Sequence, residues 1–560
     1  MRVRIPVLSI SLLTIMSISG FAQEQSPVCH VPIKTKSSNA QAMLIDGYGD
    51  VRMKVTTTSP EAQKYFDQGL ALLHSFWFYE ADKSFERAAQ IDPECAMAQW
   101  GIAMASVNDK RRNEGLKRAK ELVSGVSEHE RLYIEAVDAR YNGEKSNVQN
   151  NGFLGASESY RQGLRKIVAR YPDDLEARLF LALASMSGYK RDGTPEPGTV
   201  EAIALCQLVL ARNPKHLAAH HYMIHATESG PRPQDGVPSA DIYGTLAPKV
   251  GHAVHMPGHT YVHVDRWDDA AKAFEGSAEV DRAWIRENNE TSDHAAGPYG
   301  HNVHFLAMVY GYQGRYQDAV RVSQQLLSLD ADPAEVRSRT VFEGRLAMLR
   351  TLVRFEKWDE ILNTKMLPQE GPFEVFKAWR YYAELVAKIG MRDAVAAQVQ
   401  LDVLEREVAW LKDRFDKTKD RPQHGRQSML LRALIVAPLD ARARLLALQG
   451  KTDEAIATVR EAIEAEINLG YSEPPLYPVP MQEVAGNISL ALKQWNDAEQ
   501  FFNAALERDP GSGRAYYGLM QAQKALGRNA DATQNYARFI KAWARADKDL
   551  PGREEVSSKN

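Results

Sequence analysis

A pattern of small and large residues recurs at intervals of about 34 residues along most of this 560-residue chain. It is clearest between residues 65 and 93, where its members are Tyr65, Gly69, Leu72, Ala81, Phe85, Ala88 and Pro93. Small residues let two helices approach closely, large residues fill the space between them, and proline ends the second helix. The pattern therefore predicts a hairpin of two amphipathic helices that is repeated along the chain.

Further copies of the pattern are scattered from about residue 60 to residue 546. Their marker residues include Gly258, Tyr261, Ala270, Phe274, Ser277, Ala307, Tyr310, Gly314, Ala319, Gly450, Ala455, Gly486, Ala498, Phe502, Ala505, Pro510, Gly527 and Ala532. The pattern resembles the tetratricopeptide repeat. This resemblance implies an all-α fold, a tetratricopeptide-type helix-turn-helix solenoid that coils as a right-handed superhelix around a concave groove. In that family the groove binds proteins or extended peptides, chiefly through repeat positions 2, 5, 9, 12 and 13 of each first helix.

The repeats divide a chain that is too long for one compact core. We predict a solenoid over 59–411 with His-rich central repeats at 216–304, a charged connector at 412–428 that is a loop or an exposed helix end, C-terminal repeats at 429–546, and a disordered tail at 547–560. The Pro-rich segment 471–480 is predicted to be a stiff corner between two repeats. A long coiled coil is the alternative, and the recurring glycine and proline argue against it.

The N-terminus has the pattern of a secretory signal peptide. Arg2 and Arg4 precede an apolar stretch over 5–18, and Gly20 and Ala22 supply small residues before an expected cleavage after residue 22. A membrane anchor is the alternative, but the stretch is short and interrupted by serine and threonine. We expect residues 1–22 to be removed and 23–58 to form a polar lead-in. The mature protein is then periplasmic or secreted, without stable membrane insertion.

Charge and cysteine content exclude several classes of function. The chain has 69 basic and 72 acidic residues, so no basic excess is available to bind nucleic acid. Its three cysteines, Cys29, Cys95 and Cys206, are too few for a disulfide framework. Cys95 and Cys206 lie inside helical patterns and are predicted to be buried apolar residues. We find no metalloprotease, phosphate-loop or haem-attachment motif.

Histidines are concentrated in the central repeats, where 11 of the 15 lie between His216 and His304. Most of them are three or four residues apart, a spacing that places side chains on one face of a helix. The residues with this spacing are His221, His225, Glu228, His252, His255, His259, His263, His301 and His304. His216, His220 and His294 fall outside the pattern.

The repeat frame brings these residues onto one surface. His255 and His259 follow His221 and His225 by one full repeat length, so the two pairs occupy equivalent positions of consecutive repeats. All nine residues fall at groove-lining positions implied by the resemblance. Neighbouring first helices are about 10 Å apart, a distance that facing imidazoles can bridge through a shared ion. Pro257 complicates this arrangement because it can start or kink the helix between His255 and His259.

The histidine set predicts a transition-metal site in the concave groove. Neutral imidazole is the commonest ligand of zinc, copper and iron, and pairs four residues apart on a helix are a usual ligand geometry. The set exceeds the needs of one tetrahedral ion, which leaves room for two ions or for an open catalytic position. Recognition of peptides or anions by imidazoles and a pH-responsive groove remain alternatives.

Four phrases resemble a group of exported bacterial tetratricopeptide proteins. They are FERAAQIDPECAMAQWGIAMA (85–105), HMPGHTYVHVDRWDDA (255–270), HNVHFLAMVYGYQGRYQDA (301–319) and EPPLYPVPMQE (473–483). The resemblance implies the fold and the export, and no substrate. We interpret the chain as an exported scaffold for protein or peptide partners with a transition-metal site. A metal-dependent hydrolase or oxidoreductase using the same histidines, and copper or zinc storage or delivery, are the alternatives.

Overall fold

The computed structural model describes residues 42–142, 157–288, 293–327, 339–364, 367, 374–417 and 430–550, with side chains except at 293–297 and 339–343. These residues form α-helices, two short 3-10 turns and one isolated bridge between Tyr189 and Pro195, and none of them forms a strand. The predicted all-α fold is confirmed. The predicted signal peptide and Cys29 lie outside the described residues. No helix in the described ranges combines the length and the apolar character that crossing a membrane requires.

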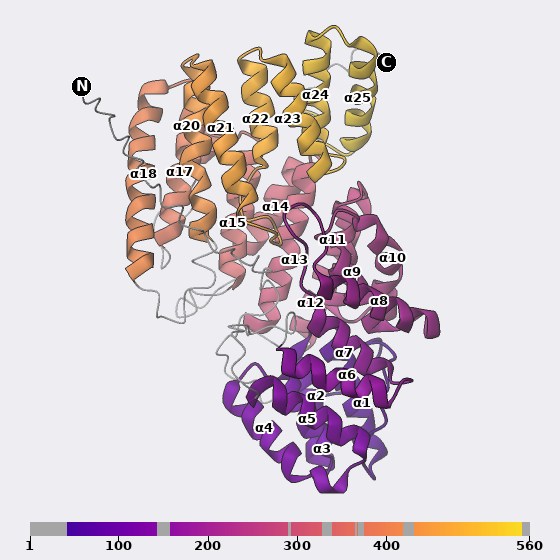
Figure 1. The fold of residues 1–560 in the computed structure, drawn as a ribbon. Coiled ribbons are helices and arrows are strands. Elements are labelled where there is room, and N and C mark those ends of the chain that lie inside the picture. The colour runs from indigo at the N-terminus through magenta and orange to yellow at the C-terminus, as the bar shows by residue number, and fades with distance from the viewer. Residues whose placement is uncertain are drawn as a thin grey trace, which may run out of the picture.

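Consecutive helices pack as hairpins that follow one another along the chain (Figure 1). The first hairpins are formed by α1 (Pro60–His74), α2 (Phe78–Ile91), α3 (Ala96–Ala105), α4 (Asp109–Glu121), α5 (Glu128–Asn142), α6 (Glu158–Arg170), α7 (Leu175–Ser185) and α8 (Pro197–Arg212). The central ones are formed by α9 (Leu217–Thr227), α10 (Val237–Leu246), α11 (Gly251–Val262), α12 (Trp267–Glu287), α13 (Asp293–Tyr312), α14 (Tyr316–Leu327), α15 (Arg339–Arg354) and α16 (Trp358–Asn363).

The C-terminal hairpins continue the same stack. They are formed by α17 (Glu374–Gly390), α18 (Ala394–Lys417), α20 (Val436–Leu448), α21 (Thr452–Ile467), α22 (Met481–Ala491), α23 (Trp495–Arg508), α24 (Gly513–Ala525) and α25 (Asn529–Ala542). In Figure 1 these helices stand as a row at one end of the molecule, and α1–α7 gather at the other. The predicted solenoid of helical hairpins therefore extends over nearly all of the described chain.

The close approach of helices depends on glycine facing phenylalanine. A Cβ atom built on the glycine would lie within 3 Å of the ring in the pairs Gly69 with Phe85 (2.8 Å), Gly258 with Phe274 (2.5 Å) and Gly486 with Phe502 (2.6 Å). Real Cβ atoms do not come this close to other atoms, so a larger residue would force the helices apart. The marker residues of the sequence pattern are therefore packing partners.

Replacing Gly486 with alanine is expected to destabilise the C-terminal repeats by about 1–3 kcal/mol, because the added methyl group overlaps Phe502 in a filled core. The midpoint of urea unfolding measures this effect. Gly125→Ala is the matched control, since a Cβ on Gly125 would meet no atom within 4 Å. An equal loss of stability in both variants would show that the ring contact is not the cause.

The turn inside many hairpins requires a left-handed backbone. Gly450 (φ 75°) and Gly527 (φ 76°) adopt this conformation without a steric cost. Phe76 (φ 55°) and Lys493 (φ 58°) occupy equivalent turns although they carry a Cβ atom, which costs about 1 kcal/mol each. Phe76 is the unusual case, because its ring lies against the histidines described below.

The inner helices of the first hairpins meet at their centre. Trp100 of α3 packs against Tyr133 of α5 and Phe180 of α7, with ring centroids 5.7 Å apart in both contacts. Phe66 of α1 joins them at 6.5 Å from Trp100. Aromatic side chains of these first helices therefore occupy the side of the N-terminal repeats on which the resemblance implies a concave groove. Elsewhere in the core, Cys95 and Cys206 are buried and not disulfide-bonded, and their predicted burial is confirmed.

The described part of the predicted lead-in packs against the core, and the described part of the predicted connector is an exposed helix end, one of the two possibilities expected from the sequence. Within the described part of 23–58, alternate residues Val51, Met53 and Val55 are buried against the core, so this part is not merely polar. Residues 412–417 are the exposed end of α18, and 418–429 lie outside the described residues. The helices on either side of this gap pack together, and Tyr382 of α17 donates a hydrogen bond to Asp440 of α20 at 2.6 Å. The repeats therefore form one stack across the connector.

The C-terminal repeats fold back onto the central ones. Trp267 Nε1 donates to the main-chain oxygen of Pro510 at 2.8 Å, and Trp543 Nε1 donates to that of Tyr312 at 3.0 Å. The amide of Asp547 donates to Gly314 at 3.0 Å. The tail predicted to be disordered from residue 547 is thus packed as far as residue 550, because these contacts satisfy its backbone and bury an apolar side chain at its end.

Candidate metal centre

Three neighbouring inner helices, α9, α11 and α13, carry the clustered histidines. Helix α11 contacts α9 on one side and α13 on the other. Pro257 lies inside α11 without ending it, so His252, His255 and His259 belong to one helix. The helix therefore does not start at Pro257, which was one of the two possibilities that the sequence left open.

The first group, which we call the α9 trio, consists of His221 and His225 from α9 and His252 from α11. One nitrogen of each ring lies within 4.8 Å of the other two. Nε2 of His221 and Nε2 of His252 are 3.1 Å apart. Two nitrogens bound to one tetrahedral zinc ion are about 3.3 Å apart, so this separation is close to that of two ligands of one ion.

The second group, the α11 trio, consists of His255 and His259 from α11 and His301 from α13. Its ligand atoms also lie within 4.8 Å of one another. The Nε2 atoms of His255 and His259 face each other at 2.6 Å. The two trios are adjacent, since the rings of His252 and His255 have centroids 6.1 Å apart.

Three of these histidines are oriented by contacts of their Nδ1 atoms with oxygen acceptors. The pairs are His221 with the main-chain oxygen of His74 (2.6 Å), His225 with Glu228 Oε1 (2.8 Å) and His259 with Glu473 Oε1 (2.9 Å). A carbonyl oxygen can only accept, so His221 carries its proton on Nδ1 and keeps a lone pair on Nε2. Nε2 of His225 is buried and has no hydrogen-bond partner among the described residues.

Two carboxylates stand behind the α11 trio. Glu473 comes from residues 471–480, which we call the strap and which connects α21 to α22. Glu228 Oε2 lies 3.9 Å from His259 Nδ1, on the same side as Glu473. Glu228, His259 and Glu473 also satisfy the distances of a metal-binding group. Because the carboxylates face Nδ1 while Nε2 faces His255, we assign them as hydrogen-bond acceptors behind a ligand.

Burial and charge set the protonation of the cluster. Burial and the imidazoles of His225 and His252 hold the pKa of His221 well below its ordinary value, so this ring is neutral and can bind a metal. Burial disfavours protonation of His259, but Glu473 and Glu228 outweigh it and raise the pKa. Burial and the nearby Glu473 raise the pKa of Glu228. Positive charge in the α11 trio is therefore stabilised, whether a proton or a metal ion supplies it.

Aromatic rings enclose both trios. The ring of Phe76 lies 4.5 Å from that of His221 and 5.4 Å from that of His225, measured between centroids. Phe305 lies 4.8 Å from His259 in the same measure. The strained backbone of Phe76 turns its ring toward the α9 trio, and such strain is often found at functional sites.

The α11 trio is buried and does not line an open groove, whereas in the α9 trio His221 is buried and His225 and His252 are half-buried. His221 is 0% exposed, and His255 and His259 are each 2% exposed. The sequence predicted that these residues line a concave surface, but Phe76 covers His221 and Glu473 contacts His259. A buried imidazole set favours a small ion over a peptide as its ligand.

Two of the predicted ligands lie beside the trios. His263 caps the C-terminus of α11, with its ring 6.3 Å from that of Tyr471, and burial lowers its pKa to about 4. His304 lies one turn beyond His301, and its Nε2 is 3.5 Å from Nε of Arg350. Both residues contact elements that surround the α11 trio and belong to neither trio.

The histidines left out of the predicted set have other partners. His220 lies 3.1 Å from the hydroxyl of Ser239, and the side chain of His294 lies outside the described residues. His216 Nε2 lies 3.1 Å from Glu176 Oε1, and His74 Nε2 lies 2.8 Å from Glu176 Oε2. Burial raises the pKa of Glu176, but the two histidines outweigh it and lower the pKa to about 2. This network supports the α9 trio, because the main-chain oxygen of His74 orients His221.

Sequence reasoning missed Glu473, Phe76 and the carbonyl of His74. Glu473 lies in a phrase quoted for its family resemblance, but several repeats separate it from His259, and no periodicity links the two. Phe76 follows a helix in an ordinary turn position, and a main-chain oxygen leaves no sequence signal. These contacts arise from the fold-back of the repeats and from the conformation of one turn.

The comparison with family models agrees with the repeat fold in one part of the chain. The family model described as tetratricopeptide repeat matches residues 303–337, which include the second half of α13 and all of α14. Solved structures to which the chain is similar include the human IFIT1 dimer with PPP-AAAA (13% identity, 86% of this chain and 95% of that chain, TM-score 0.32), yeast Tom70 (12%, 89% and 94%, TM-score 0.29) and the P58(IPK) TPR domain (13%, 83% and 98%, TM-score 0.21). No curated protein matches the sequence.

Proposed function

We propose that this chain, a protein of the tetratricopeptide-repeat type, holds two transition-metal ions, one in each histidine trio. The main support is the orientation of the imidazoles, because Nδ1 of His221, His225 and His259 faces an acceptor and leaves Nε2 as the ligand atom. Histidines that bind metals usually have this arrangement, which fixes the tautomer and makes the ligand nitrogen more basic.

The donor atoms restrict the metal. Each trio offers three imidazole nitrogens, which suit zinc, copper and iron, whereas calcium and magnesium prefer oxygen ligands. The surrounding aromatic rings lower the local dielectric constant, which strengthens the electrostatic interaction with a cation. We therefore propose a transition metal, with zinc or copper as the first ions to test.

Metal-dependent hydrolysis is a second candidate function. Three protein ligands leave one position of a tetrahedral ion for water or a substrate, as in catalytic zinc sites. Two such ions side by side can activate a nucleophile and stabilise a leaving group, and the 6.1 Å between the rings of His252 and His255 places the trios next to each other. Storage or delivery has less support, because buried and oriented ligands favour retention of the ion.

The repeat fold also suggests a partner and, with the N-terminal pattern, a location. Proteins of this type generally bind protein partners, so we propose that the chain is a scaffold whose partner contacts surfaces outside the buried trios. Residues 1–22 have the pattern of a signal peptide, and we propose that the mature protein acts in the periplasm or outside the cell.

Metal analysis of the full chain purified from a bacterial periplasmic fraction tests these proposals. We expect a mature N-terminus at residue 23 and, after loading with zinc or copper and dialysis, about two ions per chain. Less than a stoichiometric amount of zinc, copper and iron would contradict the metal proposal. An uncleaved N-terminus in the cytosol would contradict only the proposed location.

A further inference from the structure

The strap brings Glu473 to the α11 trio, but its own backbone has few N–H groups with which to form hydrogen bonds. It contains four prolines, Pro474, Pro475, Pro478 and Pro480, which lack a backbone N–H. Its carbonyl oxygens are nevertheless buried acceptors that require donors. At its start, the hydroxyl of Tyr471 donates a hydrogen bond to Glu473, and farther along Tyr477 donates to Asp440 at 2.9 Å.

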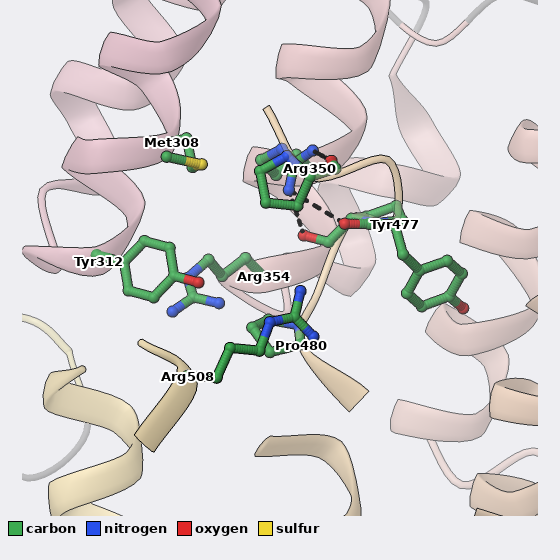
Figure 2. Close-up of a pocket in the computed structure, with 9 residues that line it drawn as sticks. Met308, Tyr312, Arg350, Arg354, Tyr477, Pro480 and Arg508 are labelled. Carbon is green, nitrogen blue, oxygen red and sulfur yellow. Dashed lines mark hydrogen bonds between the residues drawn. The ribbon is translucent and has the colours of Figure 1, made fainter. Parts of the chain in front are cut away.

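Arg350, on the inner helix α15, supplies donors to the middle of the strap. Its Nη1 lies 3.2 Å from the carbonyl oxygens of both Tyr477 and Pro478, and its Nη2 donates to that of Pro475 (Figure 2). Its Nε lies 3.5 Å from Nε2 of His304 on α13. The guanidinium presents its donors in a rigid planar fork, so one side chain fixes three strap carbonyls and contacts α13.

We infer that Arg350 is a positioning residue for the ion in the α11 trio. This inference rests on the proposed function. Arg350 holds the strap, the strap sets the carboxylate of Glu473 against Nδ1 of His259, and that contact orients Nε2 of His259 toward the ion. The α9 trio depends less on the strap, because its Nδ1 acceptors are the main-chain oxygen of His74 and Glu228, which other parts of the chain supply. The strap approaches this trio only indirectly, through the proximity of Glu473 to Glu228.

Two more arginines line the cavity beside the strap, and both are engaged elsewhere. Figure 2 shows Arg354 and Arg508 at this cavity. Arg354 pairs with Glu483 at 3.2 Å, and Arg508 pairs with Glu466 at 2.8 Å. Their charges are thus met by carboxylates of the protein, which disfavours an anion site in this cavity. Arg354 is the matched control, because it joins α15 to α22 through Glu483 instead of holding the strap carbonyls.

The test measures zinc affinity and the cobalt(II) absorption spectrum in variants that retain one trio. With His221→Ala and His225→Ala, only the α11 trio remains, and adding Arg350→Met is expected to weaken zinc binding about 10–100-fold and to shift the cobalt bands. Glu473→Gln should have a similar effect, and the two changes together should weaken binding no more than either alone. With His255→Ala and His259→Ala, only the α9 trio remains, and Arg350→Met should weaken its zinc binding much less, because Glu473 approaches this trio only through Glu228.

The results are interpreted against the control variant Arg354→Met and a check that each variant folds. Three results would overturn the inference. Arg354→Met could weaken zinc binding as much as Arg350→Met does, or Arg350→Met could weaken both trios equally. The third is that the effects of Arg350→Met and Glu473→Gln add. Circular dichroism verifies folding, and if Arg350→Met does not fold, Arg350→Lys replaces it, because a single ammonium group cannot serve three carbonyls in the same geometry. Absence of metal from the unaltered protein would contradict the proposed function itself, whereas normal metal binding in a folded Arg350 variant contradicts only this inference.

Discussion

Zinc binding is expected to fall from about two ions per chain to about one when His221 and His225 are both replaced by alanine. These residues supply two of the three nitrogens of the α9 trio, and His252 alone cannot hold an ion against dialysis. The α11 trio should keep its ion, because its nitrogens come from α11 and α13 and its carboxylate acceptor comes from the strap. Elemental analysis after dialysis measures the stoichiometry.

The reciprocal variant and a neutral control complete this experiment. His255→Ala with His259→Ala should remove the other ion and leave the α9 trio loaded. His220→Gln is the control, because His220 lies on α9 but contacts Ser239 and the main-chain oxygen of Pro214 instead of a trio. Loss of both ions from either double variant would indicate a single shared cluster, and retention of both ions would show that the trios are not the ligands.

Thermal unfolding gives an independent readout of the same sites. An ion that binds only the folded protein stabilises it by an amount that grows with free metal concentration, about 2.7 kcal/mol at 100 times the dissociation constant. Each double variant should therefore lose only the part of the metal-induced rise in Tm that belongs to its own trio. A rise that persists unchanged in both variants would mean that the metal acts elsewhere on the chain.

The hairpins were predictable because their markers are local. Gly486 and Phe502 lie on the two consecutive helices of one hairpin, α22 and α23, so a single repeat contains both partners of the contact. The helical spacing of the histidines was readable for the same reason, since residues four apart on α9 or α11 share a face whatever the rest of the chain does. The constant length of the repeat then indicated that these faces are neighbours.

The composition of each trio was not predictable from spacing. His252 faces α9 and joins His221, whereas His255, three residues later, faces α13 and joins His301. Each ring faces α9 or α13 according to how α11 is rotated about its own axis relative to these two neighbours. The repeat length alone does not determine this rotation. For the same reason His304 contacts Arg350 although it is only one turn from His301.

The enclosure of the site was not predictable either. Curvature of a solenoid is the sum of small rotations between neighbouring repeats, so a contact between His259 and Glu473 depends on every repeat between them. The strap was expected to be a corner and instead brings a carboxylate to the cluster. The same contact helps to bury the α11 trio, which the sequence had assigned to an open groove.

Replacing Glu176 with glutamine is expected to remove about 3 kcal/mol of stability at neutral pH and little at strongly acidic pH. The carboxylate is buried between His74 and His216, and its pKa falls from the ordinary 4.5 to about 2. A difference of one pKa unit corresponds to about 1.4 kcal/mol. A lowered acid pKa gives stability that is present above the unfolded value and is lost as the pH falls through the folded value.

The expected pH window is therefore from about 4.5 down to about 2. Within it, the difference in unfolding free energy between the unaltered protein and Glu176→Gln should shrink by up to about 1.4 kcal/mol per pH unit, as followed by urea unfolding at several pH values. Glu130→Gln is the control, because Glu130 is also buried but accepts from the hydroxyl groups of Thr56 and Ser127 instead of from imidazoles. A pH-independent difference for Glu176→Gln would mean that its carboxylate is not held ionised by the two histidines, and that the network behind His221 acts through packing alone.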